Sequence, residues 1–255
     1  MRPMVFSLLM LCAGVWPAAA KAQPENHVHP EVYVVPFSHL DLFWACTQEE
    51  CLSRGDFIIS KAIQLAKLHP QYRYFLETEV FVSHFVDSHR GTKELDDFKK
   101  LVKDGHIEIA PLWAAIYQNQ TPGEALVRNV VYGKRYARDV FGVDPKVAHL
   151  ADIPGFTRQY PQILSKADVP YMVMTRMGPR DLSLFHWKAP EGSAVLVWNT
   201  INGYGWGVGL GLHLDLDAAR LQAIAGDLKQ VEATTSGPIY MGWGTDLFCT
   251  ERKVD

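Results

Sequence analysis

The sequence predicts an α/β fold with a parallel sheet, and two observations favour this class. From Glu31 onward, short runs of β-branched and aromatic residues alternate with segments of helical character, as in successive βα units. The chain has 255 residues, of which 48% are hydrophobic and 21% are charged, so it is long enough to bury a sizeable core. We therefore expect one α/β domain over residues 31–255.

The expected strands are short apolar runs bounded by turn residues. They lie near residues 31–37, 72–77, 107–110, 147–151, 171–174, 194–199 and 238–242. A further short run, 185–188, is expected to form a hairpin with 194–199. The sequence Pro190-Glu191-Gly192 supplies the turn between these two strands.

Helices are expected between the strands, and the clearest spans residues 123–141. Thr121 is the expected N-cap, Pro122 suits the first helical position, and Glu124 completes a capping box. Gly142 follows at the position where helices end in a left-handed residue. Three more helices carry similar signals: 93–104 before Gly105, 161–167 opening at Pro161, and 218–232 after Asp217.

The first residues have the pattern of a secretory signal peptide. Arg2 supplies a positive charge, residues 4–15 are apolar, and Ala20-Lys21-Ala22 is a small-x-small cleavage site. The apolar stretch is too short for a transmembrane helix. We expect residues 1–22 to be removed, with cleavage after Ala20 as second choice, and residues 23–30 to be a linker. The protein would then be periplasmic or extracellular, or lysosomal or vacuolar in a eukaryote; the alternative is a retained membrane anchor.

The net charge indicates which ligands fit this protein, and the cysteines indicate which compartment fits it. The net charge is −3, and it becomes −5 without Arg2 and Lys21 because residues 1–22 contain no acid. No Lys/Arg cluster is present, so nothing favours nucleic acid, and a neutral substrate fits the balance. Cys46 and Cys51 are spaced to form a local disulfide in an oxidising compartment.

Chemically active residue types follow the expected strands. His39 and Asp41 end the first strand, and a period of two points an imidazole and a carboxylate to the same side. Both are ligand types that zinc favours. In parallel βα folds the carboxyl ends of the strands form the active-site edge. The other residues delivered there are Glu77, Glu79, Trp113, Asp152, Arg176, Asn199, Asn202, Trp243 and Asp246.

This set of side chains is typical of glycoside hydrolysis. Such enzymes use two carboxyl groups, one as acid and one as nucleophile or base, and tryptophan faces suit the apolar faces of a sugar ring. Trp44 and Trp113 are candidate platforms, although each could equally pack in the core. Asn202 opens a glycine-alternating loop, residues 202–211, which we interpret as a mobile lip over a sugar pocket.

Two stretches of the chain carry a family resemblance. Residues 37–44, Phe-Ser-His-Leu-Asp-Leu-Phe-Trp, resemble the opening metal motif of family 38 glycoside hydrolases, the retaining α-mannosidases. A second stretch is similar in order and spacing to the family's approach to its nucleophile. It comprises Thr121–Arg128, Gly133–Tyr136, Phe141-Gly142, His149–Asp152 and Tyr160–Leu164. The resemblance covers about residues 31 to 250.

The resemblance implies a fold and a set of roles. It implies a seven-stranded (β/α) barrel with parallel strands and one divalent metal, usually zinc. His39, Asp41 and Asp152 would be the metal ligands, and Asp152 would also be the nucleophile. Trp44 would stack on the sugar, and Arg176 would hydrogen-bond near the nucleophile. Gly244-Thr245-Asp246 resembles the family's Gly-Asp-Asp segment, which makes Asp246 the candidate general acid/base.

The sequence departs from the family pattern in two places. Residues 152–156 read Asp-Ile-Pro-Gly-Phe where the family commonly has Asp-x-Phe-Gly. Pro154 therefore stands where the family has an aromatic residue beside its nucleophile. The family's fourth metal ligand is a histidine well downstream, and its later helical and β-sandwich elements have no counterpart here. We therefore expect a domain that is truncated relative to the family's full chain, with His186 and His213 as possible substitute ligands.

The function expected from the sequence is metal-assisted, retaining hydrolysis of terminal α-mannosidic bonds in glycans. One alternative is a sugar-binding remnant of a mannosidase with impaired catalysis. Another is a metal-dependent carbohydrate deacetylase, which also uses Asp and His at strand ends but would need two further His at one helix spacing. The sequence does not indicate an oligomeric state.

Overall fold

The computed structural model describes residues 31–246. The expected signal peptide (1–22) and linker (23–30) lie outside these residues, as does Cys249.

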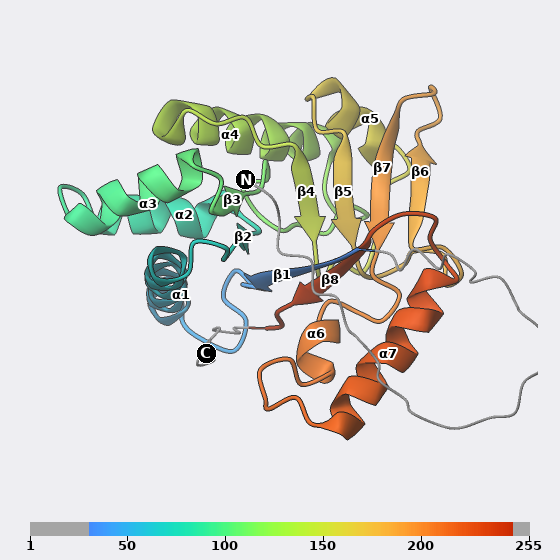
Figure 1. The fold of residues 1–255 in the computed structure, drawn as a ribbon. Coiled ribbons are helices and arrows are strands. Elements are labelled where there is room, and N and C mark those ends of the chain that lie inside the picture. The colour runs from blue at the N-terminus through green and yellow to red at the C-terminus, as the bar shows by residue number, and fades with distance from the viewer. Residues whose placement is uncertain (1–30, 247–255) are drawn as a thin grey trace, which may run out of the picture.

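The strands of the described residues form two four-stranded sheets (Figure 1). The first has the order β3-β2-β1-β8 and is wholly parallel. Its strands are β1 (Val32–Ser38), β2 (Tyr74–Leu76), β3 (Ile107–Ile109) and β8 (Ile239–Trp243). The second has the order β4-β5-β7-β6. Its strands are β4 (Val147–Leu150), β5 (Tyr171–Met174), β6 (Leu184–Lys188) and β7 (Ala194–Asn199).

This pairing confirms an α/β fold with parallel sheets. The predicted hairpin is also present, because β6 runs antiparallel to β7 while β4, β5 and β7 are parallel. Closure into a seven-stranded barrel is not shown by the pairing: strands are joined within each sheet, and no strand pair within residues 31–246 joins one sheet to the other.

Helices occupy most of the connections between the strands. They are α1 (Gln48–Leu68), α2 (Glu79–Ser88), α3 (Lys93–Lys103), α4 (Gly123–Phe141), α5 (Tyr160–Lys166), α6 (Trp206–Gly209) and α7 (Ala218–Glu232). Helices α1, α2 and α3 group beside β2 and β3, whereas α6 and α7 lie on the other side of β8 (Figure 1). Within residues 31–246 we find no helix with both the length and the apolar character required to cross a membrane.

The predicted helix signals are confirmed at most positions. Gly142 ends α4 in the left-handed region with φ 71°, and Gly105 follows α3 with φ 75°. The Asp217 side chain caps α7 by accepting from the backbone N–H of Arg220. Pro161 lies in the first turn of α5.

The capping box predicted at the start of α4 is wrong. The helix begins one residue after Pro122, and no side chain caps it. The hydroxyl of Thr121 instead donates to the carbonyl oxygen of Tyr117 at 2.7 Å. Because the preceding turn already uses this hydroxyl, it does not serve the first N–H groups of the helix.

Alternate residues of each strand face different surroundings. Tyr74, Leu76, Ile107 and Ile109 pack into the cluster formed with α1, α2 and α3. Their neighbours on the other face belong to a smaller cluster that joins β1, β2 and β3 to the end of β4: Phe37, Phe75, Ala110 and Ala151. The two sheets therefore face one another across this inner cluster, and side chains on that face from different strands meet.

Glu79, the first residue of α2, is a buried acidic residue. Its side chain is fully buried, and neither carboxyl oxygen has a hydrogen-bond partner among the described residues. This burial raises the pKa of Glu79 well above its ordinary value. The carboxyl group therefore keeps its proton to a higher pH in the folded protein than in the unfolded chain.

Glu79 should make the protein less stable as pH rises. Because the folded pKa is raised, its contribution to stability is full below about pH 4.5 and is lost as pH rises toward the folded value. Glu79→Gln removes this loss, so we expect the variant to exceed wild type in free energy of unfolding at pH 7.5 by on the order of 1–3 kcal/mol.

Urea unfolding at pH 4.5 and pH 7.5 measures this difference. The exposed Glu232→Gln variant is the control, and its unfolding free energy should stay within about 0.5 kcal/mol of wild type at both pH values. An advantage for Glu79→Gln that is the same at the two pH values would show that Glu79 does not titrate as its burial requires.

Candidate active site and metal centre

The ends of β1 and β8 meet at His39. The backbone N–H of His39 donates to the carbonyl oxygen of Thr245 at 3.1 Å, and an isolated parallel bridge joins His39 to Asp246. His39 is 2% exposed. Parallel pairing of the first and last strands of the sheet therefore brings Asp246 beside the His39-x-Asp41 motif, although the two are far apart in the sequence.

Three potential metal ligands gather at this meeting point. One donor atom from each of His39, Asp41 and Asp246 lies within 4.8 Å of the others, the one such group found within residues 31–246. Nε2 of His39 is 3.4 Å from Oδ1 of Asp41, and this buried nitrogen has no hydrogen-bond partner among the described residues. An unpaired imidazole nitrogen beside two carboxylates fits a divalent cation such as zinc.

Asp152, the third ligand predicted from the sequence, lies outside this group but faces it. Its Oδ1 pairs with Nε of Arg176. Burial raises the pKa of Asp41, the positive charge of His39 opposes this rise, and the negative charges of Asp246 and Asp152 add to it. The structure thus brings Asp152 and Arg176 together as predicted, and it sets their pair against Asp41 and Asp246.

The electrostatic balance of the site suits a cation. Three carboxylates, Asp41, Asp152 and Asp246, lie close enough to interact with one another, and the guanidinium of Arg176 pairs with Asp152. A metal would replace the proton on Nε2 of His39; with His39 then neutral, these groups leave a net charge of −2, which equals the charge that a divalent metal would neutralise.

Tyr204 completes the site on the side of β8. Its hydroxyl donates to Oδ1 of Asp246 at 2.8 Å, and its ring lies 5.5 Å from the ring of His39. Burial and this hydrogen bond raise the pKa of Tyr204 well above its ordinary value, so the phenol stays a donor. A cavity of about 350 Å³ opens beside it, lined by Thr175, Arg176, Gly203, Tyr204, Gly205 and Thr245. Its volume is in the range of small-molecule sites.

A second set of buried polar side chains lies behind His39. Nδ1 of His39 is 2.8 Å from Oε2 of Glu77, and Nδ1 of His149 is 2.5 Å from Oε1 of the same carboxylate. Nε2 of His149 is 3.0 Å from the hydroxyl of Tyr240. His149 is 3% exposed, and both of its ring nitrogens are within hydrogen-bond distance of a partner.

These contacts shift the pKa values of the buried pair in opposite directions. Burial lowers the pKa of His39, but the charges of Glu77, Asp41 and Asp246 outweigh it and raise the value to about 9. Burial favours the neutral form of Glu77, but its contacts with the two histidines outweigh this effect and lower its pKa. The acidic groups that favour the protonated form of His39 would also attract a metal ion to the same position.

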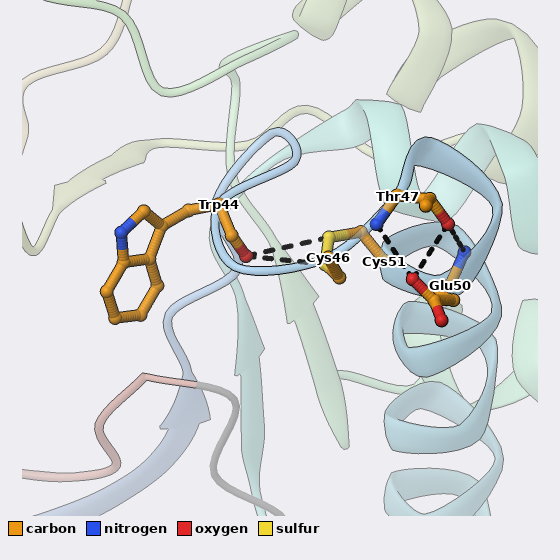
Figure 2. The surroundings of a disulfide bond; sticks show 5 residues. All are labelled: Trp44, Cys46, Thr47, Glu50 and Cys51. Atoms are coloured by element: carbon orange, nitrogen blue, oxygen red, sulfur yellow. Dashed lines mark hydrogen bonds between the residues drawn. A yellow bond between two sulfur atoms is a disulfide. The ribbon is translucent and has the colours of Figure 1, made fainter.

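The loop after Asp41 is held by a disulfide (Figure 2). The predicted Cys46–Cys51 bond is present, and it ties the loop to the first turn of α1. Thr47 and Glu50 form a capping box at that turn. The two sulfurs lie 3.3 and 3.8 Å from the carbonyl oxygen of Trp44; because disulfide sulfurs carry no hydrogen, we regard these as close contacts.

Trp44 is presented to solvent by this loop. The neighbours Phe43 (φ 75°) and Ala45 (φ 58°) both have left-handed backbone conformations, which are uncommon for residues other than glycine and are held by surrounding structure. Trp44 is 58% exposed, and Figure 2 shows its indole ring pointing away from the disulfide and from α1. The ring is therefore free to meet a ligand.

The other predicted substrate-binding residues differ in their surroundings. Trp113 is half-buried, and its ring packs edge-on against Tyr136 of α4 at 5.7 Å, as expected of a packing tryptophan. Asn202 is exposed. The segment 202–211, expected to be a lip, lines the cavity through Gly203, Tyr204 and Gly205. It also contains α6, where Trp206 is buried with Nε1 donating to Asp227; the mobility of the segment stays a prediction.

Sequence reasoning missed Tyr204 and Tyr240 and undervalued Glu77. For Glu77 and Tyr240, the alternation of side chains between the two faces of a strand was the signal that the sequence offered. Glu77 shares its face of β2 with Phe75, and Tyr240 lies between two residues, Ile239 and Met241, that face the helices. Nothing local to the sequence distinguishes Tyr204, because its role depends on where Asp246 lies.

Comparison with known proteins identifies the family to which this chain is similar. The family model "Glycosyl hydrolases family 38 N-terminal domain" matches residues 29–254. Alpha-mannosidase G of Dictyostelium discoideum is 24% identical over 186 residues, which cover 69% of this chain and 16% of that protein. The chain thus spans about one sixth of the length of this curated relative.

Solved structures resemble the fold. An alpha-mannosidase from Enterococcus faecalis V583 matches with a TM-score of 0.75 and 21% identity, over 86% of this chain and 25% of that one. A 4-alpha-glucanotransferase from Thermococcus litoralis matches with a TM-score of 0.59 and 13% identity, over 86% of this chain and 34% of that one. At these identities the likeness concerns the fold alone. The family model matches nearly the whole chain. This protein therefore belongs to family 38 of the glycosyl hydrolases, and the match is to the N-terminal domain of that family.

Proposed function

We propose that this chain carries the catalytic site of a metal-assisted, retaining α-mannosidase that hydrolyses terminal α-mannosidic bonds in glycans. The observation that carries the proposal is the unpaired, buried Nε2 of His39 beside Asp41 and Asp246, with the Asp152–Arg176 pair facing them. Family membership supports glycoside hydrolysis, and a carbohydrate is therefore the substrate class.

One divalent metal, with zinc as the first choice, would be held by His39, Asp41 and Asp152. Bound there, it would supply two coordination positions for sugar hydroxyls and so fix the ring. Asp246 belongs to the same donor group, so its role as acid/base rather than ligand is a separate part of the proposal and has its own test in the Discussion.

The carboxylate of Asp152 would attack the anomeric carbon and form a glycosyl ester as the glycosidic bond breaks. The guanidinium of Arg176 pairs with this carboxylate and orients it. Asp246 would give its proton to the leaving oxygen and then take a proton from the water that cleaves the ester. Tyr204 holds Oδ1 of Asp246, which leaves Oδ2 to carry the proton. Retention calls for a carboxyl separation of about 5–5.5 Å.

Surrounding parts of the chain would complete the enzyme. Exposed Trp44 would stack on the apolar face of the mannose ring, and Trp113 and Asn202 would line the rim. The seven parallel strands of the two sheets, without the antiparallel strand β6, would correspond to a seven-stranded (β/α) barrel, as the family resemblance implies. Export by cleavage of residues 1–22 is part of the same proposal.

Turnover of 4-nitrophenyl α-mannoside, with zinc and with EDTA, tests the function. We expect zinc-dependent release of nitrophenol, no release from the β-mannoside, and α-mannose as the first product in proton NMR. Mannose binding by calorimetry without turnover would instead indicate the sugar-binding remnant. Acetate release from an acetylated sugar would indicate the deacetylase.

A further inference from the structure

The buried carboxylate of Glu77 is hydrogen-bonded to two imidazole rings at once. It follows β2 and is 5% exposed. Oε2 lies 2.8 Å from Nδ1 of His39, and Oε1 lies 2.5 Å from Nδ1 of His149. Both oxygens of one buried carboxylate are thus used by histidines from two different strand ends, β1 and β4.

This arrangement fixes where the protons lie. An ionised carboxylate only accepts, so Nδ1 must be the protonated nitrogen on each neutral imidazole, and each Nε2 then carries a lone pair. Nε2 of His149 accepts from the hydroxyl of Tyr240 at 3.0 Å. Nε2 of His39 is left as the one ring nitrogen of the pair without a hydrogen-bond partner among the described residues, and it faces Asp41.

Aromatic packing holds the second histidine in place. The ring of His149 lies 4.7 Å from the ring of Phe37 and 5.2 Å from that of Phe75. His149 is 3% exposed, so it has little room to turn. With His149 fixed by the rings and by Tyr240, the carboxylate of Glu77 is held at one oxygen and presents the other to His39.

We propose that Glu77 is a positioning residue that locks His39 in its Nδ1–H tautomer and directs the Nε2 lone pair at the metal position. The proposal rests on the metal centre of the proposed function. A carboxylate behind a metal-binding histidine sets ring orientation and raises its basicity, and removing such a partner typically costs 10–100-fold in metal affinity. His149 and Tyr240 serve as the support for Glu77.

Glu77→Gln is the direct test. A glutamine offers one accepting oxygen and one NH₂ group, and the NH₂ group cannot accept from a second Nδ1–H. One histidine must then change tautomer or lose its partner. We expect the zinc dissociation constant, measured by competition with a chromophoric chelator, to rise roughly 10–100-fold. Glu232→Gln is the control: Glu232 is exposed at the end of α7, far from this network in the fold, and the variant should leave zinc affinity unchanged.

Nitrogen-15 NMR of the wild-type histidines gives a readout that does not depend on the variant folding. In the zinc-loaded protein, His39 should show a protonated Nδ1 and a metal-bound Nε2, and His149 a protonated Nδ1. A metal-bound Nδ1 on His39 would overturn the proposal. Equal zinc affinity of folded Glu77→Gln and wild type would also overturn it. If the wild-type protein binds no zinc, the metal centre of the proposed function is refuted. This result differs from the two results that would overturn the role of Glu77.

Discussion

Replacing Asp152 with Asn is expected to lower kcat for aryl α-mannoside hydrolysis by roughly 10⁴-fold. The amide keeps the shape of the side chain but cannot form the glycosyl ester. The guanidinium of Arg176 loses its anionic partner, but this pair is partly exposed and contributes little to stability. The variant should therefore remain folded, with a melting temperature close to that of wild type.

Two further measurements separate a lost nucleophile from general damage. Asp152 is also a proposed metal ligand, so the smaller Asp152→Ala variant is assayed at zinc concentrations that saturate it. Sodium azide should then restore its turnover and give a glycosyl azide, because azide occupies the space of the missing carboxylate. The exposed Asp181→Asn variant, in the loop beyond Arg176, should keep wild-type kcat. An Asp152→Asn enzyme that stays within tenfold of wild type would remove Asp152 from the nucleophile role.

Asp41→Asn should remove most of the metal affinity. The amide oxygen is neutral, so the site loses one of the three negative charges that face the metal position, and Nε2 of His39 loses the carboxylate that lies 3.4 Å from it. We expect the zinc dissociation constant to rise by more than about 100-fold and activity to vanish at zinc concentrations that saturate wild type. Chelator competition and assays over a range of zinc concentrations measure both effects. Unchanged zinc affinity would exclude Asp41 as a ligand.

The same measurements on Asp246→Asn decide the role of that residue. A proton donor that does not bind the metal leaves zinc affinity nearly unchanged, while kcat falls most for substrates with poor leaving groups. A ligand loses zinc affinity as Asp41 does. The proposed function requires the first pattern, although Asp246 lies in the donor group with His39 and Asp41.

Features that depend on local chain chemistry were predictable from the sequence. The positions of all the strands followed from short apolar runs, and the Cys46–Cys51 bond followed from its spacing. The capping box at Thr121 failed because a carbonyl in the preceding turn accepts from the hydroxyl. Helix α6 was missed because glycine alternation in residues 202–211 suggests a loop, whereas burial of Trp206 orders it.

The site was predictable only in part, because its members come together through tertiary pairing. His39 and Asp41 share one strand end, so the sequence identified them together. The proximity of Asp246 required the pairing of β1 with β8. The Glu77–His149 contact required two sheets to face each other across Phe37 and Phe75, and no spacing within one segment encodes it.

Anomalous diffraction at the zinc edge, from crystals of the zinc-loaded protein, tests the central claim most directly. The account predicts one strong peak about 2.0–2.2 Å from Nε2 of His39 and from a carboxylate oxygen of Asp41. A fully loaded crystal whose zinc lies elsewhere, with Nε2 of His39 still without a ligand, would contradict it.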